Sequence, residues 1–498
     1  MTNPFEVHTR STLSMPTHYL SIDVGSTSLT AVVLDLDTKS VVGSSSVPNT
    51  AEITSPNDKK IGRSEWDLDR MTELAIDNAG SLVFQTGARP AAIGITGQQQ
   101  GLQFLDNGLK SVGKFISWQD QRSKDTVEGE SRTYLDVMGE LGGAVIEDGG
   151  LPAFDNVGCP LVTGYTTPTL FWLKAHDLIP TGVHGTTAPE FVVSRLTNTR
   201  PVTDPTDALS WGVYDVTKLD WDRELIQTLG LEQNWFSNLG ESCSVAGHIT
   251  DAIATRLNVP LGIPVAVASG DHQCSFAGTV SDYENTVAIN IGTGGQSSIY
   301  VDSPMPRGWL ELRPYLQGGY LLAGVGVVGG RTFRTLRDFF NSASRAIAGY
   351  ELDPDELYDR LVELALEVPA GAEGVKFDPL FTGSRSNPLA KAAVREITPG
   401  TFTPGHMARA LFEAMAAQLA DSYREAVKLG ASERNRLVGS GNGLKLNSVL
   451  RNSLESEFGL PLELGKLNEE AAVGAALCAA VADGSYASIA EASREFAG

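Results

Sequence analysis

Two stretches near the middle of the chain carry residues whose types and spacing could perform chemistry. Residues 265–270 form a mainly apolar run that ends in Ser-Gly, and Asp271 follows directly. Such a run predicts a buried strand, which would place the carboxylate of Asp271 at the carboxyl end of that strand. A second apolar run, 287–291, opens into a glycine-rich turn at 292–294. Because backbone N–H groups in such a turn can bind phosphate oxygens, we expect a carboxylate base beside a phosphate-binding loop.

Residues 18–35 predict a β-hairpin that offers another phosphate loop. Apolar residues recur with a period of two on both sides of the turn 25–28, which reads Gly-Ser-Thr-Ser. This turn combines a permissive glycine with three hydroxyl groups, and both can face phosphate oxygens. An ordinary β-hairpin without a ligand explains the same pattern equally simply.

The two turns repeat one pattern about half a chain apart. Residues 22–27 and 289–294 both read apolar, polar, apolar, Gly, hydroxyl residue. An internal repeat of this kind predicts two similar domains, each presenting a loop to a shared cleft. Two such loops could hold the phosphate chain of one nucleotide between two lobes.

Size and composition limit the classes of function. The chain has 498 residues, enough for two or more domains, and its net charge is −22. That charge disfavours non-specific binding to nucleic acids or anionic membranes. The four cysteines form no Cys-x-x-Cys pair, which argues against a zinc site or a disulfide framework and favours the reducing cytoplasm. We expect no membrane span, and we expect residues 1–17 to form a loose N-terminal extension.

Other segments predict architecture. Residues 69–82 and 221–229 have helical apolar spacing. Thr403-Pro404 predicts the start of a helix that runs to about Leu429 and stops at Gly430. Residues 302–318 are richer in Pro and Gly and predict a loop or a hairpin.

From about residue 18 to about residue 484 the sequence resembles the FGGY carbohydrate kinases, members of the actin-like ATPase superfamily. The supporting motifs occur in the order of the family: a Gly-Gln turn at 97–101, Trp118-Gln-Asp120-Gln-Arg122, the segment 204–210, the segment 439–447, and a small-residue helix at 470–476. The resemblance implies an α/β fold of two actin-like (ribonuclease H-like) ATPase domains with a nucleotide and sugar cleft between them. It places the N-terminal domain at 18–281 and the C-terminal domain at 282–498.

The same resemblance implies ATP and Mg²⁺ as cofactors and a role for each motif residue. Asp271 would accept the proton of the sugar hydroxyl, and a helix N-cap is the alternative for this residue. Asp23 would serve the Mg²⁺–phosphate assembly through water, and a strand aspartate bonded to neighbouring backbone is its alternative. The implied nucleotide-binding residues are Asp23, Gly25, Ser26, Thr27, Ser28, Gly292, Thr293, Gly294, Gly330, Arg334, Gly441, Asn442 and Asn447. A helix-start glycine and a solvated arginine explain Gly330 and Arg334 equally well.

The implied sugar-binding residues lie in two of these motifs and directly after the apolar run 265–270. They are Gln99, Gln100, Trp118, Asp120, Arg122, Asp271 and His272. Asp120 and Arg122 have the alternative of pairing only with each other. For His272 the alternatives to catalysis are a substrate contact and plain packing.

Within the family the segments 270–275, 324–330 and 438–450 most resemble those of sedoheptulokinases, which implies that sedoheptulose is converted to sedoheptulose 7-phosphate. One departure weakens this inference, because most relatives have Met-His where this chain has Gln99-Gln100. Xylulose, ribulose or glycerol are therefore alternative acceptors. An alternative of another class is a non-catalytic, actin-like nucleotide sensor. The expected partners are a small sugar and ATP, and the sequence leaves a homodimer open.

Overall fold

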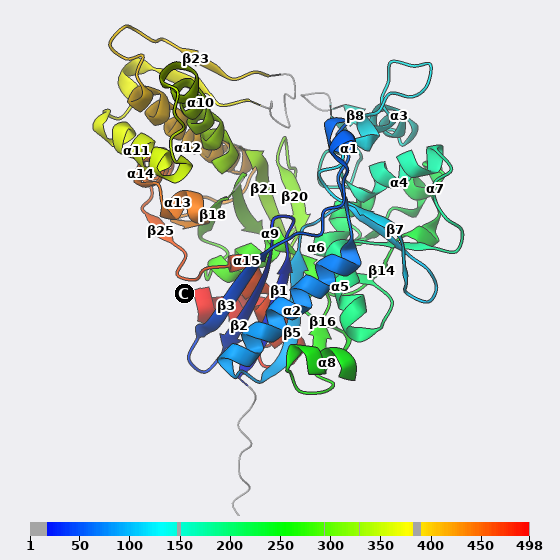
Figure 1. The fold of residues 1–498 in the computed structure, drawn as a ribbon. Coiled ribbons are helices and arrows are strands. Elements are labelled where there is room, and N and C mark those ends of the chain that lie inside the picture. Colours follow the sequence, from blue (N-terminus) through cyan, green and yellow to red (C-terminus); the bar gives the residue numbers. More distant parts are fainter. Residues whose placement is uncertain (1–16, 147–150, 293, 328, 382–389, 498) are drawn as a thin grey trace, which may run out of the picture.

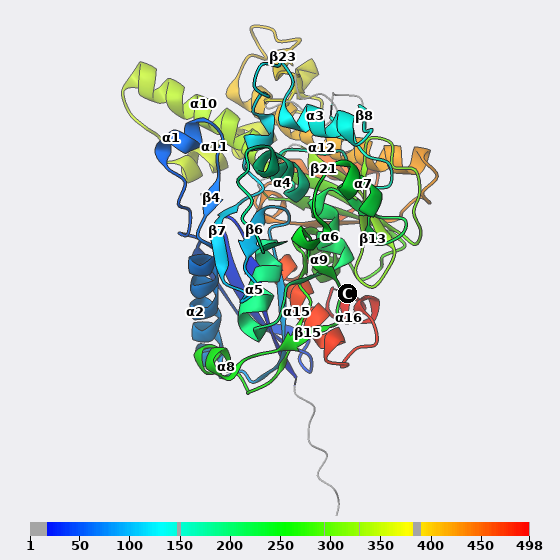
Figure 2. The ribbon, with the colours of Figure 1, turned by 90° about the vertical axis from the view of Figure 1, so that its right-hand side faces the viewer.

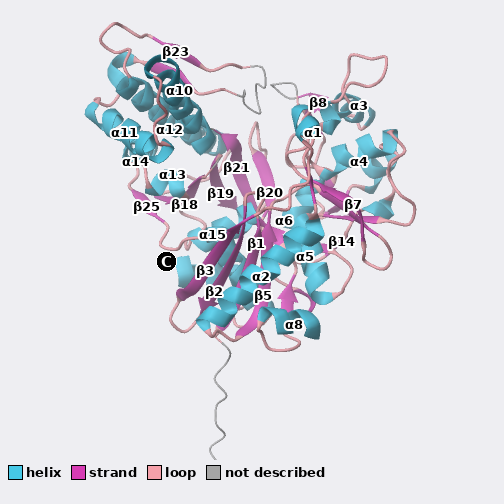
Figure 3. Ribbon diagram, viewed as in Figure 1, coloured by secondary structure: helices cyan, strands magenta, loops and turns pink. Residues whose placement is uncertain are grey.

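Two mixed β-sheets form the centres of two lobes in the computed structural model (Figures 1 and 3). The structure describes residues 17–146, 151–292, 294–327, 329–381 and 390–497. The N-terminal sheet has the order β15 (Val245–His248), β16 (Pro264–Ala266), β5 (Pro90–Gly97), β1 (His18–Val24), β2 (Ser28–Asp35) and β3 (Ser40–Pro48), with β17 (Ser269–Gly270) also paired to β5. The C-terminal sheet has the order β20 (Glu311–Pro314), β21 (Tyr320–Val327), β19 (Gly295–Val301), β18 (Thr286–Ile291), β24 (Arg436–Ser440) and β25 (Leu462–Leu464).

The two sheets share one local arrangement. In the first, β1 pairs antiparallel with β2 and parallel with β5. In the second, β18 pairs antiparallel with β19 and parallel with β24. The internal repeat that the sequence predicted is therefore present, with one hairpin at the centre of each sheet.

Helices cover both sheets and explain why the central strands are apolar. Helix α2 (Leu68–Thr86) packs on β2 and β3, and it begins at the N-cap Asp67 and ends at the left-handed Gly87. In the C-terminal lobe α12 (Pro404–Lys428) packs against α11 (Pro354–Glu367) and α14 (Ser448–Phe458). The predicted start of α12 is confirmed, because the hydroxyl of Thr403 accepts a hydrogen bond from the backbone of His406.

An insertion between β5 and β15 extends the N-terminal lobe (Figure 2). Its described residues contain five α-helices and the strands β6, β7 and β10, which form a four-stranded sheet of order β10-β6-β7-β4 with β4, a strand that precedes β5 in the chain. Their bounds are α3 (Tyr134–Leu141), α4 (Thr166–Ala175), α5 (Ala188–Thr197), α6 (Pro205–Ala208) and α7 (Arg223–Thr228) for the helices, and β4 (Glu65–Trp66), β6 (Leu102–Leu105), β7 (Ser111–Ile116) and β10 (His184–Thr186) for the strands.

The predicted helix at 221–229 is wrong at its start. Trp221 belongs to the short strand β13 (Asp220–Trp221), and α7 begins only at Arg223. Asp222 caps α7 by accepting from the backbone of Leu225, so the helix cannot extend back to the tryptophan. The indole instead packs against the rings of Trp211, Tyr214 and Phe236. The segment 302–318, predicted as a loop or a hairpin, is a loop over 302–310 followed by β20, which pairs antiparallel with β21 just beyond the segment.

Helix α15 (Glu470–Ala482) joins the two lobes. It follows the strands of the C-terminal sheet in the chain, yet it packs on β1, β5 and α9 (Asp271–Thr279) of the N-terminal lobe. Glycines allow these approaches: a Cβ atom on Gly94 would lie 1.9 Å from the carbonyl oxygen of Ala475, and one on Gly474 would lie 1.9 Å from that of Cys274. This close packing is the physical reason for the run of small residues after Glu470.

No helix in the described residues is long and apolar enough to cross a membrane.

Candidate active site

Asp271 lies at the junction of a strand and a helix. Strand β17 ends at Gly270, which is the N-cap of α9, and Asp271 is the first residue of that helix. The carboxylate accepts a hydrogen bond of 2.7 Å from the backbone N–H of His272. The strand-end position that the sequence predicted is therefore confirmed, and the N-cap role belongs to Gly270 instead.

A second carboxylate faces Asp271 across a small cavity. This cavity, of about 220 Å³, is lined by Asp23, Asp271, His272, Ser275, Asn290, Gln296, Glu469, Glu470 and Ala471. Burial raises the pKa of Asp271 to about 6, against the opposing effects of the His272 N–H and the Arg313 charge. Burial also raises the pKa of Asp23 to about 7, and the negative charges of Asp271 and Glu469 add to this. The cavity thus gathers carboxylates that repel one another.

The two predicted phosphate turns differ in how they are held. In the first, Gly25 N–H donates to the carbonyl of Ser28, and the side chain of Asn49 donates to the carbonyl of Gly25. In the second, Gly292 N–H donates to the carbonyl of Gly294, and Gly330 N–H donates to the carbonyl of Gly292. The second turn is therefore tied to the start of α10 (Gly330–Ala348). Thr293 lies outside the described residues.

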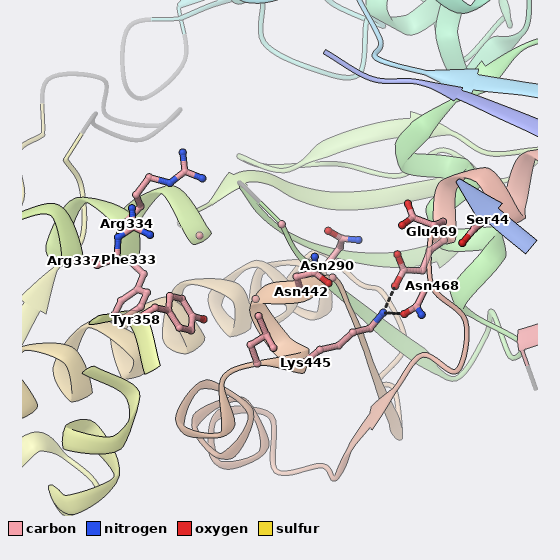
Figure 4. Close-up of a pocket in the computed structure, with 16 residues that line it drawn as sticks. Ser44, Asn290, Phe333, Arg334, Arg337, Tyr358, Asn442, Lys445, Asn468 and Glu469 are labelled. Atoms are coloured by element: carbon pink, nitrogen blue, oxygen red, sulfur yellow. Dashed lines mark hydrogen bonds and ion pairs between the residues drawn. The ribbon is translucent and has the colours of Figure 1, made fainter. Parts of the chain in front are cut away.

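A larger cavity opens beside the second turn (Figure 4). It measures about 790 Å³ and is lined by Ser44, Asn290, Gly292, Gly330, Phe333, Arg334, Arg337, Tyr358, Gly441, Asn442, Gly443, Lys445, Leu446, Asn468, Glu469 and Glu470. Five of the predicted nucleotide-binding residues line this cavity, namely Gly292, Gly330, Arg334, Gly441 and Asn442. The wall has both Arg334 and aromatic rings, as a nucleotide with an apolar base and an anionic chain requires. Glu469 and Glu470 line both cavities, so the two are neighbours.

Other predicted nucleotide residues lie away from that wall. Asn447 is buried and caps α14, accepting a 2.9 Å hydrogen bond from the backbone of Leu450. It also bonds to Tyr358, which does line the cavity. Gly25, Ser26, Thr27 and Ser28 are not among the lining residues of either cavity.

Gly441 is required by packing as well as by its place in the cavity. Its φ is +89°, a left-handed value that favours glycine, and a Cβ atom would lie 2.5 Å from the carbonyl oxygen of Ile291. The glycine thus lets the loop after β24 approach the end of β18.

On the sugar side, Gln99 joins residues from both lobes. Its amide nitrogen donates to the carbonyl of Thr206 at 2.7 Å, and its oxygen accepts from Arg313 of β20 at 3.0 Å. Arg313 is buried and pairs with Glu311 at 2.7 Å. Gln100 lies beside it with a φ of +71°. The side-chain oxygen and nitrogen of Gln99 are therefore both hydrogen-bonded within the protein.

His272 is held in its neutral form. Burial, followed by the charge of Arg313, lowers the pKa of its imidazole well below the usual value. Its Nε2 lies 2.9 Å from the hydroxyl of Ser298, and its Nδ1 lies 3.4 Å from Arg313. An Nε2–H tautomer satisfies both contacts, so this side chain bridges the lobes.

The Trp118, Asp120 and Arg122 motif is organised around an ion pair. Asp120 and Arg122 are both buried, and the guanidinium Nε donates to the carboxylate at 2.8 Å. Asp120 also accepts from the backbone of Ser64, and Arg122 also reaches Glu65 at 3.1 Å. The predicted alternative of mutual pairing is present, and Trp118 beside it is half-buried.

Sequence reasoning missed three residues of the site. Asn290 was detectable, because it occupies in the second repeat the position of Asp23 in the first. Lys445, whose Nζ donates to Asn468 at 2.7 Å inside the large cavity, lies in a recognised motif without a role of its own. Arg313 had no signal, because its segment predicted only a loop or hairpin.

Comparisons with known proteins cover nearly the whole chain. The model of the N-terminal domain of the FGGY family of carbohydrate kinases matches residues 18–278, and that of the C-terminal domain matches residues 288–482. The chain is 25% identical over 496 residues to a sedoheptulokinase of Mus musculus, covering 92% of this chain and 96% of that one. It is 26% identical over 480 residues to a xylulose kinase of Haemophilus influenzae, covering 94% and 91%.

A solved structure shares the fold. The ligand-bound xylulose kinase from Lactobacillus acidophilus matches with a TM-score of 0.81 at 21% identity, over 97% of this chain and 92% of that one. The two-lobed fold of this chain is therefore that of a solved xylulose kinase.

Proposed function

Because the chain belongs to the FGGY family of carbohydrate kinases, we propose that it phosphorylates sedoheptulose to sedoheptulose 7-phosphate. The family makes the chain an ATP-dependent phosphotransferase that acts on a sugar hydroxyl, which sets aside the non-catalytic sensor. The identity of the sugar and the roles of individual residues are the content of the proposal.

One observation carries the assignment of roles. Asp23 and Asp271, 248 residues apart in the sequence numbering, line a single small cavity next to the larger one that fits a nucleotide. Asp271 would accept the proton of the acceptor hydroxyl as the phosphoryl group moves. Because the transition state of phosphoryl transfer is loose, holding the hydroxyl in line matters more than a strong base.

The donor set fits Mg²⁺. Within the described residues no cluster of three His, Cys, Asp or Glu side chains is arranged as a metal site. Mg²⁺, however, usually keeps several waters and needs only one or two carboxylates beside substrate phosphates. Asp23 would hold the ion, whose chemistry is to neutralise charge on the phosphates. A nearby cation would also lower the pKa of Asp23, which is raised by burial and then by the charges of Asp271 and Glu469.

The choice of sedoheptulose rests on the segment after the base. Gly270-Asp-His-Gln273 resembles the corresponding segment of sedoheptulokinases, and a relative of that name matches over almost the full length. Xylulose is the second candidate, because the xylulose kinase relative is equally similar.

A panel of acceptors tests the proposal. Purified protein is assayed for ADP formation with sedoheptulose, xylulose, ribulose and glycerol, and kcat/KM is compared. We expect the highest kcat/KM with sedoheptulose and a large loss of turnover with every acceptor in Asp271→Asn. Absence of sedoheptulose turnover alongside turnover of another sugar would reject the substrate while leaving the kinase assignment intact.

A further inference from the structure

The segment Asp204-Pro-Thr206-Asp207 has no role in the mechanism above, yet it is buried and contacts Gly270, the residue before the base. Asp204, Thr206 and Asp207 each have a side chain that is 0% exposed. Asp204 is the N-cap of α6, a helix of only four residues. A helix this short does not need a fully buried carboxylate as its cap. The contacts of Asp204 give another reason for its burial.

The carboxylate of Asp204 is surrounded by donors. One oxygen accepts from the hydroxyl of Thr206 at 2.6 Å and from the backbone of Asp207 at 3.0 Å. The other accepts from the hydroxyls of Ser242 at 2.6 Å and Ser269 at 2.8 Å. A buried charge is tolerated when it is hydrogen-bonded in this way. Asp204 thus ties its own segment to the segments of Ser242 and Ser269.

Thr206 connects Asp204 to the segment that carries the base. Because its proton is donated to Asp204, the lone pairs of its hydroxyl are free to accept, and they receive the N–H of Gly270 at 2.8 Å. Gly270 immediately precedes Asp271. The neighbouring carbonyl of Ser269 accepts from Thr96 at 2.8 Å. The peptide group between Ser269 and Gly270 is therefore held at both its carbonyl and its N–H.

The same residue also holds the turn that faces the sugar. The backbone carbonyl of Thr206 accepts from the amide of Gln99 at 2.7 Å. Gln99 packs so tightly on the base segment that a Cβ atom on Gly270 would lie 2.1 Å from its Nε2. The hydroxyl and the carbonyl of one residue thus bind the two parts of the site that must meet at the acceptor hydroxyl.

We propose that Thr206 is a positioning residue for phosphoryl transfer, whose hydroxyl orients Asp271 and whose carbonyl orients Gln99, with Asp204 as its anchor. This inference rests on the proposed role of Asp271 as the base, and it is independent of which sugar is the acceptor. Since reactions in a prearranged site are sensitive to small displacements, loss of the hydroxyl lowers the rate of transfer more than it lowers binding.

The test compares Thr206→Val with Thr206→Ser, using the best acceptor of the panel. Val removes the hydroxyl at nearly constant volume, and Ser keeps it. We expect kcat to fall about 100-fold in Thr206→Val, with the KM for ATP and the affinity for ADP unchanged, and to recover to within a few-fold of wild type in Thr206→Ser.

Thr203→Val is the matched control. Thr203 is equally buried, three residues away, and within the described residues its hydroxyl has no hydrogen-bond partner. Its substitution should leave kcat unchanged. Equal kcat in wild type and Thr206→Val, or an equal loss in Thr206→Val and Thr203→Val, overturns the proposal.

A second pair remains informative if Thr206→Val does not fold. Ser242→Ala and Ser269→Ala each remove one hydroxyl donor from the same oxygen of Asp204. Only Ser269 belongs to the base segment, so kcat should fall in Ser269→Ala and stay near wild type in Ser242→Ala. Equal effects would mean that Asp204 acts through stability alone.

Asp271→Asn is measured in parallel to separate the two levels of inference. If it remains active, the base assignment fails and the positioning role of Thr206 fails with it. If it is inactive while Thr206→Val retains full activity, the base assignment stands and only the positioning role is wrong.

Discussion

The two central hairpins have the same strand arrangement, but the first carries an acidic residue where the second carries a neutral one. Asp23 and Asn290 occupy the same position, two residues before the glycine of each turn. The carboxyl group of Asp23 has a raised pKa because it is buried near Asp271 and Glu469. The amide of Asn290 instead donates to the hydroxyls of Ser275 at 3.3 Å and Ser440 at 2.9 Å.

This difference shows how two copies of one hairpin can take different roles at a single nucleotide. An aspartate in both hairpins would add another carboxylate to a cavity that Asp23, Asp271 and Glu469 already line. Like charges that close together would strongly raise one another's pKa values. The N-terminal hairpin therefore carries the charge, and the C-terminal hairpin carries a neutral tether that connects β18, α9 and β24.

The largest effect is expected from Asp271, which belongs to neither hairpin but lines the cavity that Asp23 and Asn290 share. Asp271→Asn should reduce kcat about 10²- to 10⁴-fold, the usual contribution of a general base. ADP binding, measured by calorimetry, should stay within a few-fold of wild type because the nucleotide cavity does not include Asp271. Retained turnover would show that another group accepts the proton.

Asp23→Asn makes the first hairpin electrostatically equal to the second. We expect kcat/KM for ATP to fall about 100-fold, a typical loss when one electrostatic group of an active site is removed. The Mg²⁺ concentration for half-maximal rate should rise. Asp67→Asn, at the N-cap of α2 and not among the residues that line either cavity, is the control. A Mg²⁺ dependence that is unchanged in Asp23→Asn would remove Asp23 from the metal site.

Asn290→Asp makes the opposite change. The added charge joins a cavity that the carboxylates of Asp23, Asp271, Glu469 and Glu470 already line. The KM for ATP should therefore rise about tenfold, which corresponds to about 1.4 kcal/mol. Asn290→Ser, which stays neutral, should have a smaller effect. If Asp and Ser at this position behave alike, the tether matters and the charge does not.

The pH dependence of kcat/KM reports the ionisation of Asp271. With a pKa of about 6 in the free enzyme, Asp271 is ionised at pH 8 and becomes protonated as the pH falls. The value of kcat/KM should therefore decrease below about pH 6, by about tenfold per pH unit. Asp23→Asn should leave this midpoint nearly unchanged, since Asp23, with a pKa of about 7, is already mostly protonated at pH 6. A profile that is flat from pH 8 to pH 5 would contradict the assignment.

The smallest effect is expected outside the phosphate region. Gln99→Met removes the acceptor of Arg313 and the donor to Thr206. The KM for the sugar should rise several-fold, by about 1 kcal/mol for a lost hydrogen bond, with no change in the KM for ATP. Gln119→Met, at an exposed glutamine, is the control. A reduced KM would mean that Gln99 opposes sugar binding.

The sequence by itself determined the elements whose signals are local. The period-two runs around 25–28, the apolar run before Asp271 and the Thr403-Pro404 helix start depend on neighbouring residues, and each is present in the structure. The repeat of Asp23 and Asn290 was also readable, because both copies keep the same short pattern. The prediction of a helix start at Trp221 was wrong, because the indole packs against other aromatic rings instead of following the local helical pattern.

Only the tertiary structure decided which polar groups meet. Arg313 reaches Gln99 across 214 positions, and Ser269 reaches Asp204 across 65. No periodicity or cap encodes such contacts, because they depend on how the two sheets, α9 and α15 pack together. For the same physical reason the sequence could predict a base at Asp271, while the groups that would orient it became visible only in the folded chain.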